Sequence, residues 1–172
     1  EMLWEMQRQG QARLAERGYT QYEVSAYAHA GMECRHNLNY WQYGDYLGIG
    51  AGAHQKLTDA NRQRIRRSWK LKNPRDYLAA AHGEVRIGGS SEPDADEVVL
   101  EFLMNALRLN AGFQTAQFEE STGLDFEHMR PALERARARD LLEPDEPWRC
   151  TDLGRRFLND LLAEFVPDDG HA

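Results

Sequence analysis

The stretch CRHNLNYW, residues 34–41, places a thiol, a guanidinium, an imidazole, amides and two aromatic rings side by side. A neutral imidazole such as that of His36 is a good ligand for zinc, iron or haem iron. A lone histidine is more often a structural hydrogen-bonding group, and spacing alone does not decide between the two roles. Because no HExxH motif or His/Cys cluster accompanies His36, a metal site with several protein ligands is not expected.

Haem differs from a bare metal ion because the porphyrin supplies four nitrogens and one axial protein ligand suffices. Tyr40 and Trp41 are flat side chains that suit a porphyrin, and Arg35 could pair with a propionate. The alternative interpretation is that Tyr40 and Trp41 fill the core beneath a neighbouring strand. The residue types alone favour this plainer interpretation, so haem binding by residues 34–41 is a hypothesis at this point.

The stretch GIGAGAH, residues 48–54, contains GxGxG and not a complete GxGxxG. Gly48, Gly50 and Gly52 permit close approach of the backbone to a ligand, or a positive φ. No helix with the expected acidic partner follows, so the stretch is weak as a dinucleotide motif. A tight turn is the favoured interpretation.

Residues 62–72, RQRIRRSWKLK, alternate in part and predict an edge or half-exposed strand. Ile65, Trp69 and Leu71 would share one face, and the basic residues the other. Such a face could bind nucleic acid by charge and stacking, although a solvated basic face is more common. No Ser/His/Asp arrangement, carboxylate pair or P-loop is recognisable.

Charge divides the 172-residue chain into two parts. Residues 1–91 carry 13 Lys/Arg and 9 Asp/Glu, or +4, whereas residues 92–172 carry 8 and 19, or −11, which together give −7. This asymmetry indicates two units with different surfaces. It also argues against nucleic-acid binding by the second unit, because phosphate binding needs positive surface.

The composition is that of a globular protein, with 41% hydrophobic and 28% charged residues. No apolar run approaches the ~20 residues that span a bilayer, and no signal peptide is visible. Cys34 and Cys150 are too far apart for a CxxC motif and are interpreted as reduced thiols. A cytoplasmic location is therefore expected.

The elements that position these motifs follow from periodicity and caps. The first half predicts a helix over 2–17 ended by Gly18, a strand over 21–28, a long functional loop over 29–44, a short strand near 46–49 and a helix that begins at Pro74 and ends just before Gly83. The chain is thus of the α+β class.

A Gly-, Ser- and Pro-containing linker over 88–96 coincides with the change of charge. Beyond it, we predict a helix with a capping box at Asp94 and Glu97, helices over 115–122 and 127–139, two short strands around EPDEP and a last helix capped by Thr151. This order is similar to that of a winged-helix unit spanning 97–166, followed by a frayed tail over 167–172.

Residues 22–54 resemble the radical-SAM family of oxygen-independent coproporphyrinogen III oxidase-like proteins, and more narrowly its haem-chaperone branch. The resemblance is strongest in HNxxYW and in the stretch that ends at His54, and it extends more weakly over the whole chain. The matching residues are Tyr22, Glu23, Ser25, Tyr27, His36, Asn37, Tyr40, Trp41, Tyr46, Gly48, Ile49, Gly50, Gly52, Ala53 and His54. Ala51 and Gln55 depart from the Pro and Ser that the family pattern leads us to expect.

The resemblance implies an N-terminal partial α/β barrel in which CxxxCxxC holds a [4Fe-4S] cluster that binds S-adenosylmethionine. That motif does not occur in the sequence. We therefore expect a C-terminal fragment in which residues 1–87 are the end of the barrel with a bridging region, before the helical domain. Such a fragment should have no radical chemistry of its own.

In the chaperone branch, HNxxYW is the motif implicated in haem binding. The resemblance thus implies His36 as a candidate iron ligand, Tyr40 and Trp41 packed on the macrocycle and Asn37 orienting the loop. Gly48, Gly50 and Gly52 would let the backbone approach the cofactor.

The implied function is haem binding and delivery. Haem or porphyrin, the N-terminal barrel and haem-accepting proteins would be the partners. The alternative is part of a genuine coproporphyrinogen III oxidase, which converts two propionates to vinyl groups. A nucleic-acid-binding winged helix is a minor alternative.

Overall fold

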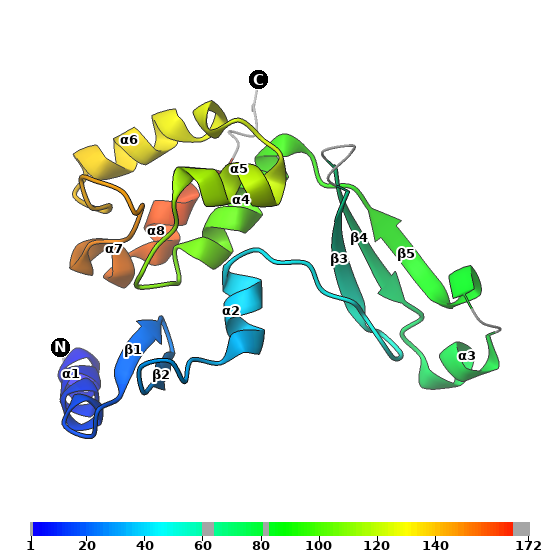
Figure 1. Ribbon diagram of the computed structural model, residues 1–172, viewed down its shortest axis with the longest axis horizontal. Helices are drawn as coiled ribbons and strands as arrows, with labels where there is room; N and C mark the ends of the chain where they lie inside the picture. The colour runs from blue at the N-terminus through cyan, green and yellow to red at the C-terminus, as the bar shows by residue number, and fades with distance from the viewer. Residues whose placement is uncertain (1, 60–63, 81–82, 167–172) are drawn as a thin grey trace.

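The computed structural model describes residues 2–59, 64–80 and 83–166. The mixed α+β class is confirmed, and Figure 1 shows three parts: a helical body, a two-stranded hairpin beside the first helix, and a three-stranded sheet on the opposite side. The predicted tail over 167–172 lies outside the described residues. Within the described ranges, no helix has both the length and the apolarity to cross a membrane.

The first helix and its cap agree with the prediction. Helix α1 spans Met2–Ala15, and Gly18 takes a left-handed conformation with φ +77° just beyond its end. The single strand predicted over 21–28 is wrong, because β1 (Thr20–Glu23) and β2 (Ala26–Ala28) pair antiparallel. The Glu23 carboxylate accepts hydrogen bonds from the Ser25 amide and hydroxyl at 2.9 and 2.7 Å, which stabilise the turn between them.

The loop predicted over 29–44 contains a helix. Helix α2 spans Arg35–Trp41 and ends where Tyr43 takes a positive φ of 59°. Because α2 has only seven residues and none is buried, the sequence shows no sustained apolar period there. The functional stretch is therefore helical at its centre and irregular only on either side.

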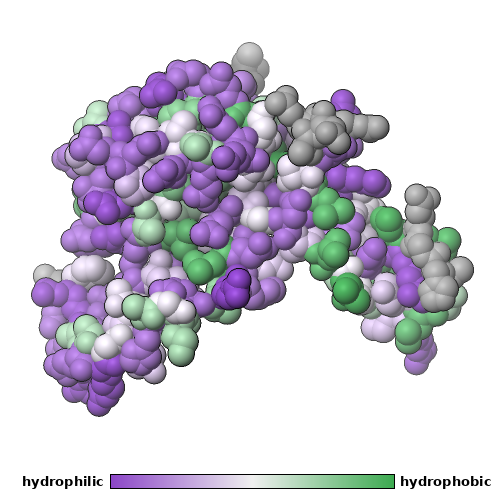
Figure 2. All heavy atoms as spheres, in the orientation of Figure 1, coloured by the Kyte–Doolittle hydropathy of each residue, from purple (hydrophilic) through white to green (hydrophobic). Residues whose placement is uncertain are grey.

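Three antiparallel strands form the second sheet in the order β3-β4-β5, namely His54–Asp59, Arg64–Lys70 and Ile87–Ser91. The prediction of an edge or half-exposed strand is confirmed in its second form, because β4 lies between the other two strands and has both buried and exposed residues. The short strand expected near 46–49 is reduced to a bridge between Tyr46 and Lys56. Figure 2 shows apolar residues at the surface of this part, whereas the helical body is mostly hydrophilic.

The faces of β4 also differ from the prediction. Ile65 is buried as expected, but Ser68 is buried as well and Trp69 is exposed. The pairing of β4 with β5 shifts register next to Trp69, and the indole lies over Gly89. A Cβ at Gly89 would stand 2.3 Å from the Trp69 ring, so the glycine makes room for it.

The segment between β4 and α4 is more structured than the expected linker. Pro74 begins α3 as predicted, but α3 (Pro74–Ala79) ends early, and a 3-10 turn, η1 (Gly83–Arg86), precedes β5. Residues 81–82 of the predicted helix are outside the described part of the chain. Since β5 includes residues 88–91, the linker prediction is wrong for that portion.

The helical body follows the predicted pattern closely. Helix α4 (Ala95–Ala106) begins at the Asp94–Glu97 capping box, and α5 (Thr115–Thr122) has the predicted bounds. A 3-10 turn, η2 (Phe126–His128), then leads into α6 (Arg130–Ala138), which has proline in its first turn. Phe102 contacts both Phe113 and Phe118 edge to face in the core.

The last predicted helix is divided at Phe157 into α7 (Asp152–Arg156) and α8 (Leu158–Ala163). The Thr151 cap is confirmed, because its hydroxyl accepts a hydrogen bond from the Gly154 amide at 3.0 Å. The division leaves Leu153 and Phe157 exposed, although their spacing in the sequence is that of a helix's apolar face. The strands predicted around EPDEP are reduced to isolated bridges, Phe113 with Trp148 and Leu142 with Cys150.

A clamp formed by residues 108–110 joins the hairpin to the helical body. The Val24 amide donates to the Arg108 carbonyl at 3.2 Å, and the Asn110 amide donates to the Tyr22 carbonyl at 3.0 Å. An ion pair of 3.0 Å between Arg108 and the buried Glu23 completes the clamp across 85 positions of sequence. Residues far apart in the chain thus fix the hairpin below the helical body (Figure 1).

Candidate functional site

Helix α2 presents an imidazole and a phenol on one exposed face. His36 and Tyr40 are four positions apart, which places them one above the other on a helix. Their ring centroids are 5.0 Å apart and nearly perpendicular, and the Tyr46 ring lies 4.7 Å beyond Tyr40. His36 is exposed, and no hydrogen bond of its ring occurs within the described residues. The structure therefore brings His36 and Tyr40 together and adds Tyr46 to them.

The remaining polar residues of the motif take different positions. Asn37 is half-buried and forms no hydrogen bond in the described ranges. Asn37 was expected to orient the loop. Instead Asn39 contacts the loop, because its side-chain amide donates to the Asp45 carbonyl at 3.0 Å. Arg35 and Cys34 are exposed at the start of α2. Asn39 thus ties α2 to the loop that follows it.

Trp41 points toward the helical body and not along the His36 face. The Arg108 guanidinium covers one face of its ring at 4.3 Å from the centroid, and the same guanidinium pairs with Glu23. Successive helical residues are rotated by about 100°, so Trp41 and Tyr40 cannot face the same way. Trp41 therefore anchors α2 to the clamp at residues 108–110.

The three glycines shape the loop between α2 and β3. Gly50 and Gly52 have positive φ values of 107° and 70°, which confirms the predicted tight turn. A Cβ at Gly48 would stand 2.5 Å from the His54 carbonyl oxygen, so only glycine permits this close approach. The side chains between the glycines, Leu47 and Ile49, are 71% and 87% exposed. The loop thus displays two apolar side chains close in sequence to Tyr46, which with His36 and Tyr40 forms a row of aromatic rings, the aromatic row.

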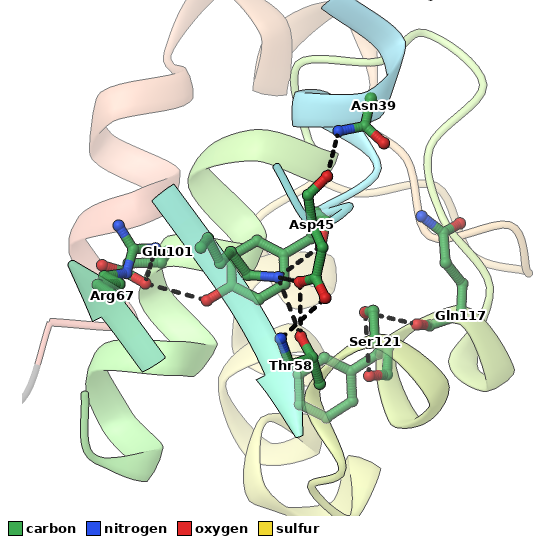
Figure 3. A network of polar contacts seen from close by, with 10 residues as sticks. Asn39, Asp45, Thr58, Arg67, Glu101, Gln117 and Ser121 are labelled. Carbon is green, nitrogen blue, oxygen red and sulfur yellow. Dashed lines mark hydrogen bonds and ion pairs between the residues drawn. The ribbon is translucent and has the colours of Figure 1, made fainter. Parts of the chain in front are cut away.

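A buried lysine supports this loop from behind. Lys56, on β3, donates to the Tyr43 carbonyl at 2.9 Å and to Asp45 Oδ1 at 3.1 Å, and its ammonium lies 4.1 Å from the Tyr43 ring centroid. Asp45 also accepts from the Thr58 amide and hydroxyl, both at 2.8 Å. Figure 3 shows Asp45 held between α2 and β3 by these contacts.

Charge and burial act against each other in this network. Burial lowers the pKa of Lys56, although Asp45 opposes the shift. Burial alone would raise the pKa of Asp45, but hydrogen bonds from Thr58 and Lys56 outweigh it and hold that pKa below its usual value. Burial, followed by the nearby Glu101 carboxylate, raises the pKa of Tyr43. Tyr43 donates to Glu101 at 3.0 Å and is therefore a neutral donor at physiological pH.

Asp45→Asn is expected to lower the free energy of unfolding at neutral pH by about 1 kcal/mol, a modest value because the Asp45 side chain is 41% exposed. The folded-state pKa of Asp45 lies below its unfolded value, so this stabilisation is complete above the unfolded pKa and is lost as pH falls through the folded one.

Urea denaturation of wild type and variant across the acidic range would measure the difference, which should shrink as the pH decreases. Glu92→Gln is the matched control, because Glu92 forms a solvent-exposed ion pair of 3.4 Å with Arg64. A constant difference at all pH values, or an equal loss in the control, would contradict the prediction.

Strand β4, which is rich in arginine, has less unpaired positive charge than its sequence suggests. Arg67 pairs with Glu101 and Arg64 pairs with Glu92, so two of its arginines already have carboxylate partners. His54 stacks with Trp69 at 6.1 Å between ring centroids. Among the residues that the structure describes, no three His, Cys, Asp or Glu side chains gather to hold a metal ion.

Comparison with known proteins identifies the helical body. The model of the HemN C-terminal domain matches residues 94–157, from the cap of α4 to just beyond α7. Heme chaperone HemW of Haemophilus influenzae is 40% identical over 168 residues, which are 97% of this chain. Residues 94–157 are thus similar to the HemN C-terminal domain, and nearly the whole chain is similar to part of a heme chaperone.

Other relatives extend the match beyond that domain. Heme chaperone HemW of Escherichia coli is 40% identical over 96% of this chain, and that of Lactococcus lactis is 30% identical over 91%. The similarity to the heme chaperones thus includes α2 and its loop, and it confirms the resemblance to the haem-chaperone branch. This chain spans 43% of the length of the first two relatives and 40% of the third. No solved structure gives a significant match.

Sequence reasoning missed the residues that support the loop between α2 and β3. Lys56 lies in β3, which was not predicted, and nothing in HQKLTD indicates that its lysine is buried. Arg108 lies just after the end of α4, and its contact with Trp41 depends on tertiary structure alone. Tyr46, by contrast, could be indicated from sequence, because it lies only a few positions after Tyr40 and Trp41.

Proposed function

We propose that this chain binds haem and takes part in haem delivery, as the haem-handling part of a haem chaperone. The observation that carries the proposal is the exposed His36 imidazole, which has no hydrogen-bond partner in the described ranges and stands at the end of an aromatic row. A neutral imidazole with a free ring nitrogen can act as an axial ligand of haem iron. The relatives named heme chaperone support this assignment.

The surroundings of His36 fit a flat, apolar ligand that carries carboxylates. Tyr40 would lie beside the macrocycle, and the exposed side chains of Leu47 and Ile49 offer apolar contact. Arg35, on the same short helix, is free to meet a propionate. Asn37, Trp41 and Gly48, Gly50 and Gly52 belong to the proposed site as residues that shape the helix and its loop.

The exposure of α2 suits delivery more than storage. No residue of α2 is buried, and the imidazole is not enclosed by other elements. A ligand held on such a helix can reach an acceptor protein without unfolding of the site. We therefore propose haem-accepting proteins as partners of this face.

We further propose the architecture of the longer protein. Residues 1–87 would be the end of a radical-SAM barrel with a bridging region, and residues 97–166 a winged-helix-like domain. The two cysteines cannot supply three thiolates, so this chain does not fit a [4Fe-4S] cluster or the S-adenosylmethionine it would bind. Both cysteines are free, which favours a cytoplasmic location.

His36→Ala is expected to weaken haem binding by on the order of 100-fold, because even the loss of a residue that only orients a metal ligand commonly weakens binding by 10- to 100-fold. The test is titration of haemin into wild type and variant, with the Soret band as the readout.

His128→Ala is the matched control, since His128 is exposed in the helical body and away from α2 in the chain. Saturable binding that is lost in His36→Ala and kept in His128→Ala would support the proposal. Equal affinity of all three proteins, or no binding by wild type, would overturn it.

A further inference from the structure

A second concave surface lies between α1 and α7. It is a groove of about 810 Å³, and Val24 in the turn of the hairpin and Asn110 also line it. Figure 1 shows α1 and the hairpin below α7. Its volume is in the range of ordinary ligand sites. Nothing in the proposed haem site uses it.

Two arginines in the groove have no carboxylate partner. Arg8, on α1, makes no ion pair or hydrogen bond in the described ranges. Arg156, on α7, lies 4.8 Å from the ring centroid of Trp4 and pairs with no acid. Arg155 differs, because it donates to Asp152 at 2.6 Å and to the Cys150 carbonyl at 3.3 Å. The groove thus holds two uncompensated positive charges in a chain of net charge −7.

Side-chain amides line the space between these arginines. Gln11 donates to Gln21 at 3.0 Å, and Gln21 donates to the Val24 carbonyl at 2.9 Å. The Oδ1 atom of Asn110 is buried without a hydrogen-bond partner, and Gln7 has none in the described part of the chain. Amides both donate and accept hydrogen bonds, as a peptide backbone does.

The groove is lined by polar and apolar surface in nearly equal parts. Trp4, Val24 and Leu153 are the apolar residues among its eleven lining residues. A porphyrin needs a mostly apolar lining, so this half-polar groove suits it poorly. A peptide whose acidic side chains reach Arg8 and Arg156 matches the amides, the charges and the apolar side chains together.

We propose that the groove between α1 and α7 binds an extended acidic segment of a partner protein. The two arginines pair with its carboxylates, the amides bond its backbone, and Trp4 and Leu153 receive an apolar side chain. This function is independent of haem binding at His36. It gives the protein a docking site for a partner protein in addition to the proposed site for haem.

The test uses fluorescence anisotropy of a short labelled peptide of alternating Glu and Leu, with a peptide of alternating Gln and Leu for comparison. The double variant Arg8→Gln/Arg156→Gln is expected to weaken binding of the Glu peptide by about tenfold or more. The variant Arg13→Gln/Arg149→Gln is the matched control, because it removes the same charge at exposed positions outside the groove.

Binding of the Glu peptide that falls in the groove variant and not in the control, and that weakens with salt, would support the proposal. His36→Ala should leave this binding unchanged, which separates it from the haem site. No binding of the Glu peptide, equal binding of the Gln peptide, or equal loss in both arginine variants would overturn it. Competition by metal-free protoporphyrin for the same two arginines would also overturn it, in favour of a porphyrin site.

Discussion

Phe102→Ala is expected to lower the free energy of unfolding by about 4 kcal/mol, near the upper range for core truncations. Phe102 is fully buried, and its ring contacts those of Phe113 and Phe118 with centroid distances of 4.9 and 5.1 Å. It also meets Tyr43 at 5.7 Å, so the substitution removes a contact between the helical body and the loop after α2. The cavity would lie where these rings meet and could not collapse without moving several of them.

Chemical denaturation followed by circular dichroism would measure this loss. Phe102→Leu keeps most of the apolar volume and should cost about 1–2 kcal/mol. Phe157→Ala truncates an exposed phenylalanine of the same body and should cost less than either. The packing described for the core would be wrong if Phe102→Ala were as stable as Phe157→Ala.

Gly154→Ala is expected to destabilise the helical body by about 3 kcal/mol or more, although alanine is normally the better helix former. Gly154 lies within α7, and a Cβ there would stand 1.9 Å from the Leu141 carbonyl oxygen and 2.9 Å from its carbon. Both contacts are with backbone, which cannot move aside as a flexible side chain can. The substitution would therefore separate α7 from the segment that carries Leu141 and Leu142.

Gly10→Ala makes the same chemical change inside α1, where nothing lies within 4 Å of the added Cβ. It should not lower stability and can add up to about 1 kcal/mol to helix formation. Thermal unfolding should show a lower midpoint temperature than wild type for Gly154→Ala, and an equal or higher one for Gly10→Ala. Equal effects would show that the close approach of α7 to Leu141 does not exist in solution.

The helical body could be predicted from sequence because its signals are local. The Asp94–Glu97 capping box and the apolar stripe of α4 each depend on residues within a few positions. By contrast, β3 and β5 exist only through their pairing with β4, and GGSS has the composition of a linker. The division at Phe157 depends on how α7 packs against Leu141, which no local pattern reveals.

The candidate site was predictable in part. The HNxxYW spacing selects His36 and Tyr40, and helical spacing then places them on one face. The orientation of Trp41 depends on Arg108, 67 positions away. The sequence could therefore not show whether Trp41 anchors α2 to the helical body or contacts a ligand. The burial of Lys56 depends on the same kind of distant contact.

The clamp at residues 108–110 has a consequence for how the protein is made. The hairpin leaves the ribosome before its partner Arg108, which is synthesised 85 residues after Glu23. Until then, one edge of β1 has unpaired backbone groups that another nascent chain could pair with. Slow or interrupted translation between these two points should therefore increase aggregation, whereas a chain extended past Asn110 can cover the edge by itself.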